Sequence, residues 1–243
     1  METSIYKDTW DKIQNFQSWR GFISRFPWDK NELSAVYQFG VFTGKSICEI
    51  HRNFKETNKN IDIIYGFDSF EGLPECTNQE RKEAIEKHGE YQWKAGDFNS
   101  HEWHGVDDAR QHLEIVFEKY LDREIKLIEG WFENTLNENT IKEYDLKPAL
   151  FVDIDVDIYS SCYEVLDFLF KYGIAVPGTT LGFDDWGGTP SWKLLDDGNP
   201  RAFKEIIEKY KLTIDHVVRV GDAYPHVANV FLVRSVGGKT YES

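Results

Sequence analysis

The chain has 243 residues, of which 41% are hydrophobic and 15% aromatic, enough to build the core of one α/β domain. Its 42 acidic and 28 basic residues give a net charge of −14, which disfavours binding to nucleic acids or anionic membranes. Three widely spaced cysteines without a CxxC pair, and no long apolar run, predict a cytoplasmic protein with neither disulfides nor a membrane span.

Residues 6–26 carry aromatic and aliphatic side chains at approximately helical spacing, which predicts one or two amphipathic helices before the main fold. From Ala35 onward, short apolar runs alternate with longer helical patterns, which predicts an α/β fold with a doubly wound, mostly parallel sheet. We therefore divide the chain into an N-terminal helical cap or lid, residues 1–33, and a single domain, residues 34–243. Strands are predicted over residues 35–42, 61–68, 125–130, 150–155 and 179–185, and helices from about Ser46 and over residues 109–120, 163–173 and 201–210.

The chain ends in two further apolar runs, DHVVRVGDA from Asp215 and VANVFLVRSV from Val227. The segment between them, which contains Tyr224 and Pro225, is too short for a crossover helix, so the two strands should pair as an antiparallel hairpin. The polar segment 75–112 is predicted to be an insertion or a mobile loop. Within it, HEWH at residues 101–104 is one residue shorter than the zinc motif HExxH, and we interpret it as surface loop.

Residues that follow the predicted strands are candidates for ligand binding, because open parallel sheets bind ligands outside the carboxyl ends of their strands. After the first strand, GVFTGKS supplies Gly40 and Gly44, which permit close approach of the backbone, and Ser46, which opens a helix. A purely structural turn explains the glycines equally well. The second strand ends at Asp68, at a spacing typical of an acidic residue that binds ribose hydroxyls. The alternative is a capping role in DSFEG.

The stretch FVDIDVDIYSS places Asp153, Asp155 and Asp157 in a run that is otherwise typical of a buried strand. Unpaired buried carboxylates are costly, so positive charge should lie nearby. The next predicted strand ends in Asp184 and Asp185, and neighbouring strand ends would bring four of these carboxylates together. An oxygen-rich site of this kind holds Mg²⁺, Ca²⁺ or Mn²⁺. Solvated loop aspartates and helix caps are the alternative.

Three stretches, FGVFTGKS, YGFDSFEGLPE, and DVDIYSS followed by FDDW, resemble in order and spacing the macrocin O-methyltransferase (TylF) family of class I S-adenosylmethionine-dependent methyltransferases. KAGDF at Lys94 and EGWFENTL at Glu129 are similar to two further stretches of that family. The resemblance covers about residues 37–202 and implies a seven-stranded, Rossmann-like sheet that ends in a hairpin. It also implies S-adenosylmethionine as the methyl donor, with a divalent metal ion beside the acceptor.

By motif position, the resemblance implies that Asp155, Asp184 and Asp185 bind the metal and that Asp157 is the general base. Asp153 lies outside the motif and receives no role other than that of a partner behind the ligands. Gln38 replaces the family's usual Glu, which affects contacts around the amino-acid end of the donor. Donor binding is implied for Gly40, Thr43, Gly44, Ser46, Asp68, Ser69, Asp97 and Phe98.

The sequence thus predicts methyl transfer to a hydroxyl of a sugar or sugar-containing small molecule, whether nucleotide-linked, a natural product or a surface polysaccharide precursor. Mg²⁺ is the expected metal, with Mn²⁺ or Ca²⁺ as alternatives, and a homo-oligomer is left open. Two other functions remain. One is a glycosyltransferase that binds metal and a nucleotide sugar through a DxD pair, and the other is a non-catalytic module that binds S-adenosylmethionine. The set of carboxylates favours an enzyme.

Overall fold

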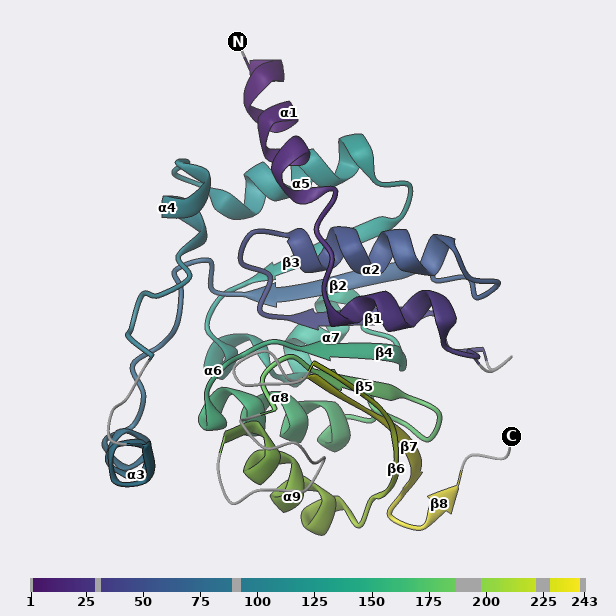
Figure 1. Cartoon of the computed structure of the whole chain (residues 1–243). Coiled ribbons are helices and arrows are strands. Elements are labelled where there is room, and N and C mark those ends of the chain that lie inside the picture. The colour runs from purple at the N-terminus through teal and green to yellow at the C-terminus, as the bar shows by residue number, and fades with distance from the viewer. Residues whose placement is uncertain (1, 29–31, 89–92, 187–197, 222–227, 241–243) are drawn as a thin grey trace.

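The structure, a computed structural model, describes residues 2–28, 32–88, 93–186, 198–221 and 228–240. These residues form one mixed β-sheet with helices on both of its faces (Figure 1). Within the described ranges, no helix is both long enough and apolar enough to span a membrane.

Seven strands cross the sheet in the order β3-β2-β1-β4-β5-β7-β6, and the two-residue β8 pairs with β7. The first five strands are parallel, whereas β7 is antiparallel to both β5 and β6. The predicted doubly wound sheet and its closing hairpin are confirmed, although the connection with Tyr224 and Pro225 lies outside the described residues. The strands are β1 Ala35–Phe39, β2 Ile63–Asp68, β3 Glu124–Glu129, β4 Ala149–Ile154, β5 Thr180–Phe183, β6 Thr213–Val220, β7 Ala228–Val236 and β8 Lys239–Thr240.

Helices cover the two faces of the sheet and form two hydrophobic cores. Alternate residues of β1 point to opposite faces. Tyr37 and Phe39 therefore join the core that contains α8 and α9, while Val36 joins the core that contains α2, α5 and the N-terminal segment. The helices are α1 Glu2–Ile13, η1 Trp19–Arg25, α2 Lys45–Lys55, α3 Asn78–His88, α4 Ser100–His104, α5 Ala109–Tyr120, α6 Phe132–Thr135, α7 Glu138–Tyr144, α8 Tyr159–Lys171 and α9 Gly198–Tyr210.

The polar segment 75–112 contains more regular structure than the sequence predicted. It includes α3 and α4 and the start of α5. Helix α3 is tied to α8 by the Glu80 carboxylate, which accepts a hydrogen bond from the backbone N–H of Ser160 at 2.8 Å. The interpretation of HEWH as surface loop is wrong, because these residues belong to α4, where His104 packs between Trp103 and His112.

Gly40 directly follows β1, where the backbone of Asp155 comes very close. Its φ is +85°, and a Cβ added there would lie 1.9 Å from the carbonyl oxygen of Asp155. The same two strand ends are joined by a hydrogen bond from the Asp155 N–H to the Phe39 carbonyl at 3.0 Å. The freedom of glycine is thus used for the close approach of β1 and β4, while approach to a ligand, as the sequence suggested, stays a prediction.

Replacing Gly40 by alanine should therefore destabilise the protein far more than replacing Gly96, which has nearly the same φ of +84° but nothing within 4 Å of an added Cβ. Gly96→Ala should lower the free energy of unfolding by about 1–2 kcal/mol, the typical cost of a left-handed residue. Gly40→Ala adds a backbone clash of about 1–3 kcal/mol or more. Urea unfolding measures both variants, and equal losses would contradict this explanation of Gly40.

Candidate active site

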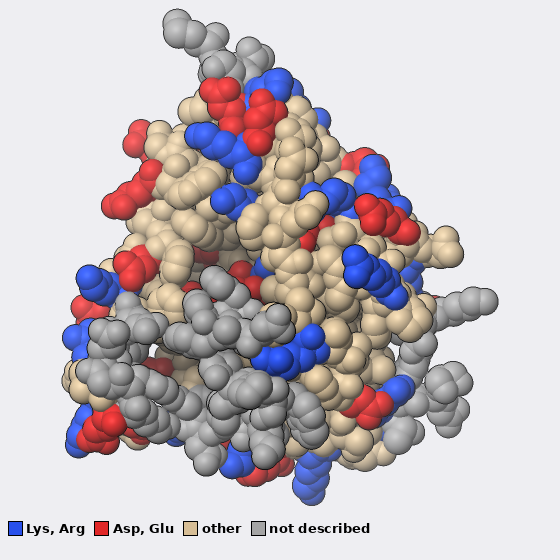
Figure 2. Space-filling view, in the orientation of Figure 1, with Lys and Arg blue, Asp and Glu red and all other residues tan. Residues whose placement is uncertain are grey.

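A large cavity opens at the carboxyl edge of the sheet. Its volume is about 1350 Å³, and it is lined by the N-terminal residues Phe16–Arg20 and by the segments that follow β1, β2, β3, β4 and β5. Figure 2 shows a hollow in this face of the molecule, with acidic side chains visible inside it. Ligand pockets commonly measure about 300–1,000 Å³, so this cavity can hold two small molecules together.

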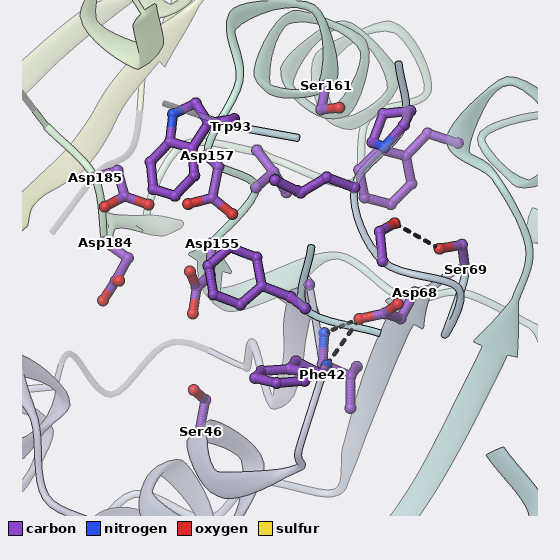
Figure 3. Close-up of a pocket in the computed structure, with 18 of the residues that line it drawn as sticks. Phe42, Ser46, Asp68, Ser69, Trp93, Asp155, Asp157, Ser161, Asp184 and Asp185 are labelled. Carbon is purple, nitrogen blue, oxygen red and sulfur yellow. Dashed lines mark hydrogen bonds between the residues drawn. The ribbon is translucent and has the colours of Figure 1, made fainter. Parts of the chain in front are cut away.

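Asp68, at the end of β2, clamps the two loops that form one wall of the cavity. One carboxylate oxygen accepts hydrogen bonds from the backbone N–H groups of Val41 (2.6 Å) and Phe42 (2.8 Å), as Figure 3 shows. The other accepts from the N–H of Phe70 at 2.6 Å. Burial raises the pKa of Asp68 above its ordinary value although these three bonds lower it. No helix begins within residues 69–77, so the helix-cap alternative for Asp68 is wrong, and the carboxylate joins two loops instead. The carboxylate also lines the cavity and keeps lone pairs for a ligand.

The stretches FEGLP and KAGDF form a second wall by pairing with each other. The Leu73 N–H donates to the Asp97 carbonyl at 2.8 Å, and the Gly96 N–H donates to the Leu73 carbonyl at 2.9 Å. The Asp97 carboxylate accepts from the N–H of Lys94 at 2.9 Å, and Asp97 is not among the residues that line the cavity. Phe98 does line it and meets the ring of Phe42 edge to face, with centroids 5.5 Å apart.

Of the other residues predicted to bind the methyl donor, some line the cavity and some only pack behind it. Thr43, Ser46 and Ser69 line the cavity, and the hydroxyl of Ser69 donates to the Gly72 carbonyl at 3.1 Å. Gly44 does not line it. Gly44 caps α2 at a φ of +78°, and a Cβ there would lie 2.8 Å from the Phe117 ring, so this glycine serves helix packing.

Gln38 lies on β1 immediately behind the loop. Its side-chain N–H donates to the Gly40 carbonyl at 2.8 Å, and its buried carbonyl oxygen has no partner within the described part of the chain. Gln38, where the family usually has Glu, therefore leaves a buried hydrogen-bond acceptor next to the loop predicted to bind the methyl donor.

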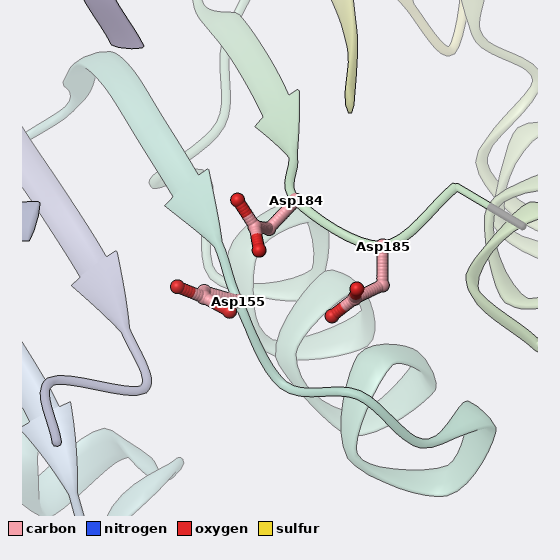
Figure 4. A group of neighbouring side chains, drawn as sticks. All are labelled: Asp155, Asp184 and Asp185. Atoms are coloured by element: carbon pink, nitrogen blue, oxygen red, sulfur yellow. The ribbon is translucent and has the colours of Figure 1, made fainter. Parts of the chain in front are cut away.

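The predicted metal ligands meet between the ends of β4 and β5 (Figure 4). One carboxylate oxygen from each of Asp155, Asp184 and Asp185 lies within 4.8 Å of the others. Burial and the charge of Asp184 raise the pKa of Asp155 well above its ordinary range. Burial and the charge of Asp157 do the same for the pKa of Asp185. Crowded carboxylates with raised pKa values are those that a cation stabilises most.

Asp157 stands at the edge of this group, outside the three-residue set. Its φ of +59° is unusual for a residue other than glycine, and backbone strain of this kind clusters at functional sites. Burial and the neighbouring charge of Asp155 raise the pKa of Asp157 to about 7. Figure 3 shows the side chains of Asp157 and Asp185 next to each other.

The positive charge expected near Asp153 is supplied by an arginine that the sequence did not single out. Arg20, in η1, is 2% exposed and reaches across the core to contact three aspartates. Its Nε donates to the buried carboxylate of Asp153 at 2.5 Å. Burial alone would lower the pKa of Arg20, but the charges of Asp153, Asp155 and Asp184 raise it above its ordinary value. Burial also raises the pKa of Asp153 to about 6, although Arg20 lowers it.

Sequence reasoning missed Arg20 and its neighbour Trp19, whose indole N–H donates to a carboxylate oxygen of Asp184. Both lie in the segment 6–26, whose apolar stripe was predicted to form one or two amphipathic helices of a cap or lid. The available signal was an arginine within that apolar stripe, combined with buried aspartates that needed a partner elsewhere in the chain.

The cluster of aspartate carboxylates fits a divalent cation, both in the type of its ligand atoms and in its negative charge. All three candidate ligands offer oxygen atoms, which Mg²⁺, Ca²⁺ and Mn²⁺ prefer. The five aspartates at these strand ends face the single guanidinium of Arg20 within the described part of the chain, so negative charge remains to be balanced.

Comparison with known proteins supports one family. The model of the macrocin-O-methyltransferase (TylF) family matches residues 33–205, more than half of the chain. No curated protein matches the chain in sequence.

Solved structures of O-methyltransferases share the fold. The O-methyltransferase NovP has a TM-score of 0.53 and 17% identity, over 95% of this chain and 78% of NovP. The calicheamicin methyltransferase CalS11 has a TM-score of 0.56 and 17% identity, over 96% of this chain and 79% of its own. An O-methyltransferase from Bacillus cereus in complex with SAH has a TM-score of 0.54 and 12% identity, over 95% and 90%. At these identities the likeness establishes the fold alone.

Proposed function

The chain belongs to the macrocin O-methyltransferase (TylF) family of S-adenosylmethionine-dependent O-methyltransferases, and we propose that it methylates a hydroxyl of a sugar or sugar-containing small molecule at a divalent metal site. The observation that carries the proposal is the meeting of Asp155, Asp184 and Asp185 in the same cavity as the loop after β1. The glycosyltransferase alternative has no support, because the family match and the shared fold are those of methyltransferases.

The donor would occupy the side of the cavity formed by the loops after β1 and β2. Asp68, Ser69, Thr43 and Ser46 supply polar groups there, and the exposed ring of Phe98 offers a flat apolar surface for the adenine. Gly40 also lines the cavity, whereas Gly44 and Asp97 act behind this surface by shaping the loops that carry it. In Figure 3 the donor wall, marked by Asp68 and Ser69, lies opposite the aspartates.

The acceptor would lie between the donor and the aspartates. Asp155, Asp184 and Asp185 would hold the cation, which when bound polarises acceptor hydroxyls and lowers their pKa. Asp157 would take the proton from the acceptor hydroxyl. The hydroxyl oxygen attacks the methyl carbon of the donor, and the bond from that carbon to sulfur breaks. A carboxylate with a pKa raised to about 7 suits this role, because a general base works best when its pKa lies near the working pH.

The charge of the cavity narrows the class of acceptor. The lining includes nine acidic residues but, among the described residues, only two basic ones, Arg20 and Lys45. A diphosphate would be repelled by this lining, so an uncharged or cationic sugar-containing acceptor fits better than a nucleotide-linked sugar.

Replacing metal ligands and base should have separable effects. Asp155→Asn or Asp184→Asn should abolish metal binding and activity together, since each removes a ligand. Asp157→Asn should retain metal and donor binding but slow methyl transfer by about 10²–10⁴-fold. Calorimetry with Mn²⁺ and a labelled-methyl assay measure the two properties. EDTA should stop the wild type and Mg²⁺ restore it, and full activity of the EDTA-treated protein would refute the metal site.

Asp68→Ala should affect both the fold and the donor site. Three backbone N–H groups lose their acceptor, so the free energy of unfolding should fall by about 1–3 kcal/mol. If Asp68 also binds ribose hydroxyls, donor affinity should fall by a similar amount of about 1–3 kcal/mol. A donor analogue without the ribose 2′ hydroxyl separates the two roles. The wild type should bind this analogue more weakly than the parent donor, whereas Asp68→Ala should bind the two ligands equally well. If both proteins show the same difference in affinity between the two ligands, Asp68 does not bind the ribose and only holds the two loops together.

The charge of the acceptor should determine how efficiently the protein methylates it. For one sugar presented either as an uncharged glycoside or as a nucleoside diphosphate conjugate, kcat/KM should be at least about tenfold higher for the glycoside, equivalent to about 1.4 kcal/mol. Glu133→Gln and Glu164→Gln, both in the lining, should reduce this preference. A wild type that prefers the diphosphate conjugate would contradict the electrostatic argument.

A further inference from the structure

Arg20 contacts the candidate metal site from outside the part of the chain that the family model matches. Its three guanidinium nitrogens each bind a different carboxylate, with Nε on Asp153 (2.5 Å), Nη2 on Asp155 (2.8 Å) and Nη1 on Asp184 (3.3 Å). Residues 33–205 match the family, so the motifs that define the site assign no role to this residue.

Residues of the same N-terminal segment hold the guanidinium of Arg20 in place. The Ser18 hydroxyl accepts from Nη1 at 3.1 Å, and the guanidinium carbon lies 4.9 Å from the centre of the Trp19 ring. Ser18 is fixed in turn by Glu49, a buried residue of α2, whose carboxylate accepts from both the N–H and the hydroxyl of Ser18 at 2.6 Å. The side chain of Arg20 is therefore held in one orientation, and it can orient the aspartates that it contacts.

Two of the oriented aspartates are candidate ligands from different strands. Arg20 uses Oδ2 of Asp155 and Oδ1 of Asp184, and it leaves the second oxygen of each carboxylate without an arginine contact. Without the guanidinium, repulsion would turn these two carboxylates away from each other. Asp185, the third candidate, has no ion pair with Arg20 among the described contacts.

We propose that Arg20 is a positioning residue that presents Asp155 and Asp184 to the metal ion, with Asp153 as its buried anchor. This inference rests on the proposed metal site. Partners behind metal ligands typically contribute about 10–100-fold to metal affinity because they fix the ligand orientation. The positive charge of Arg20 also repels the cation, but in this arrangement each ligand offers one oxygen to Arg20 and keeps the other for the metal, so orientation dominates.

The test compares variants that remove the guanidinium without leaving a buried charge unpaired. Arg20→Met alone would strand the Asp153 carboxylate, so Arg20→Met is made together with Asp153→Asn and compared with Asp153→Asn alone. Calorimetric titration with Mn²⁺ should show affinity about 10–100-fold lower in the double variant. S-adenosylhomocysteine affinity and thermal stability, measured on the same samples, should be similar in the two proteins.

Two further variants separate orientation from charge and from docking of the segment. Arg20→Lys keeps the charge but not the planar fork, so it should also bind Mn²⁺ at least about tenfold more weakly than the wild type. Arg52→Met removes a side chain that holds the same segment through the carbonyls of Gln14 and Phe16, without touching the aspartates, and it should bind Mn²⁺ as the wild type does.

The outcomes distinguish this inference from the proposal on which it rests. Equal or tighter Mn²⁺ binding in the double variant, wild-type binding in Arg20→Lys, or an equal loss in Arg52→Met would each overturn the role of Arg20 while leaving the metal site intact. Failure of the wild type itself to bind Mn²⁺ would overturn the metal site and, with it, the role of Arg20.

Discussion

Carboxylates crowded at the ends of β4 and β5 repel one another and lose hydration on burial, so the surrounding structure has to provide positive charge there. The N-terminal segment provides part of it. η1 packs beside α2 in the same core and brings Arg20 to Asp153, which is completely buried. Ile13, Trp19 and Ile23 of this segment are buried in one of the two cores, and the remaining negative charge faces the cavity.

The order of the strands explains why this charge is concentrated. β1 lies between β2 and β4, so the loop after β1 borders both the Asp68 clamp and the aspartates after β4. The close contact of Gly40 with the backbone of Asp155 fixes the distance between these two halves of the cavity. A donor held over β1 and β2 and an acceptor held over β4 and β5 would meet above this contact, as methyl transfer requires.

The sequence predicted the sheet well, because strands follow from local patterns, whereas the roles of the site residues stay predictions. Apolar runs identified the strands, and the residues after two of them indicated that four carboxylates lie close together, of which Asp155, Asp184 and Asp185 form one cluster. The long-range contacts could not be read in the same way. Arg20 lies 133 residues from Asp153, and only folding brings them together. The Asp68 clamp was weighed as a cap, but its reach to Val41 and Phe42 depends on the packing of two loops. Helix α3 was not predicted because its sequence is almost entirely polar, and its contact with Ser160 of α8 is also tertiary.

The central claim is that three aspartates from two strand ends hold a divalent cation beside the methyl donor. A crystal structure of the protein with Mn²⁺ and S-adenosylhomocysteine, recorded at a wavelength that gives anomalous scattering from manganese, tests it most directly. The account predicts one anomalous peak bound by Asp155, Asp184 and Asp185, with Arg20 still on the outer oxygens of the first two and the donor sulfur facing the peak. A manganese-soaked crystal without a peak at these residues, or with the donor bound elsewhere, would contradict the account.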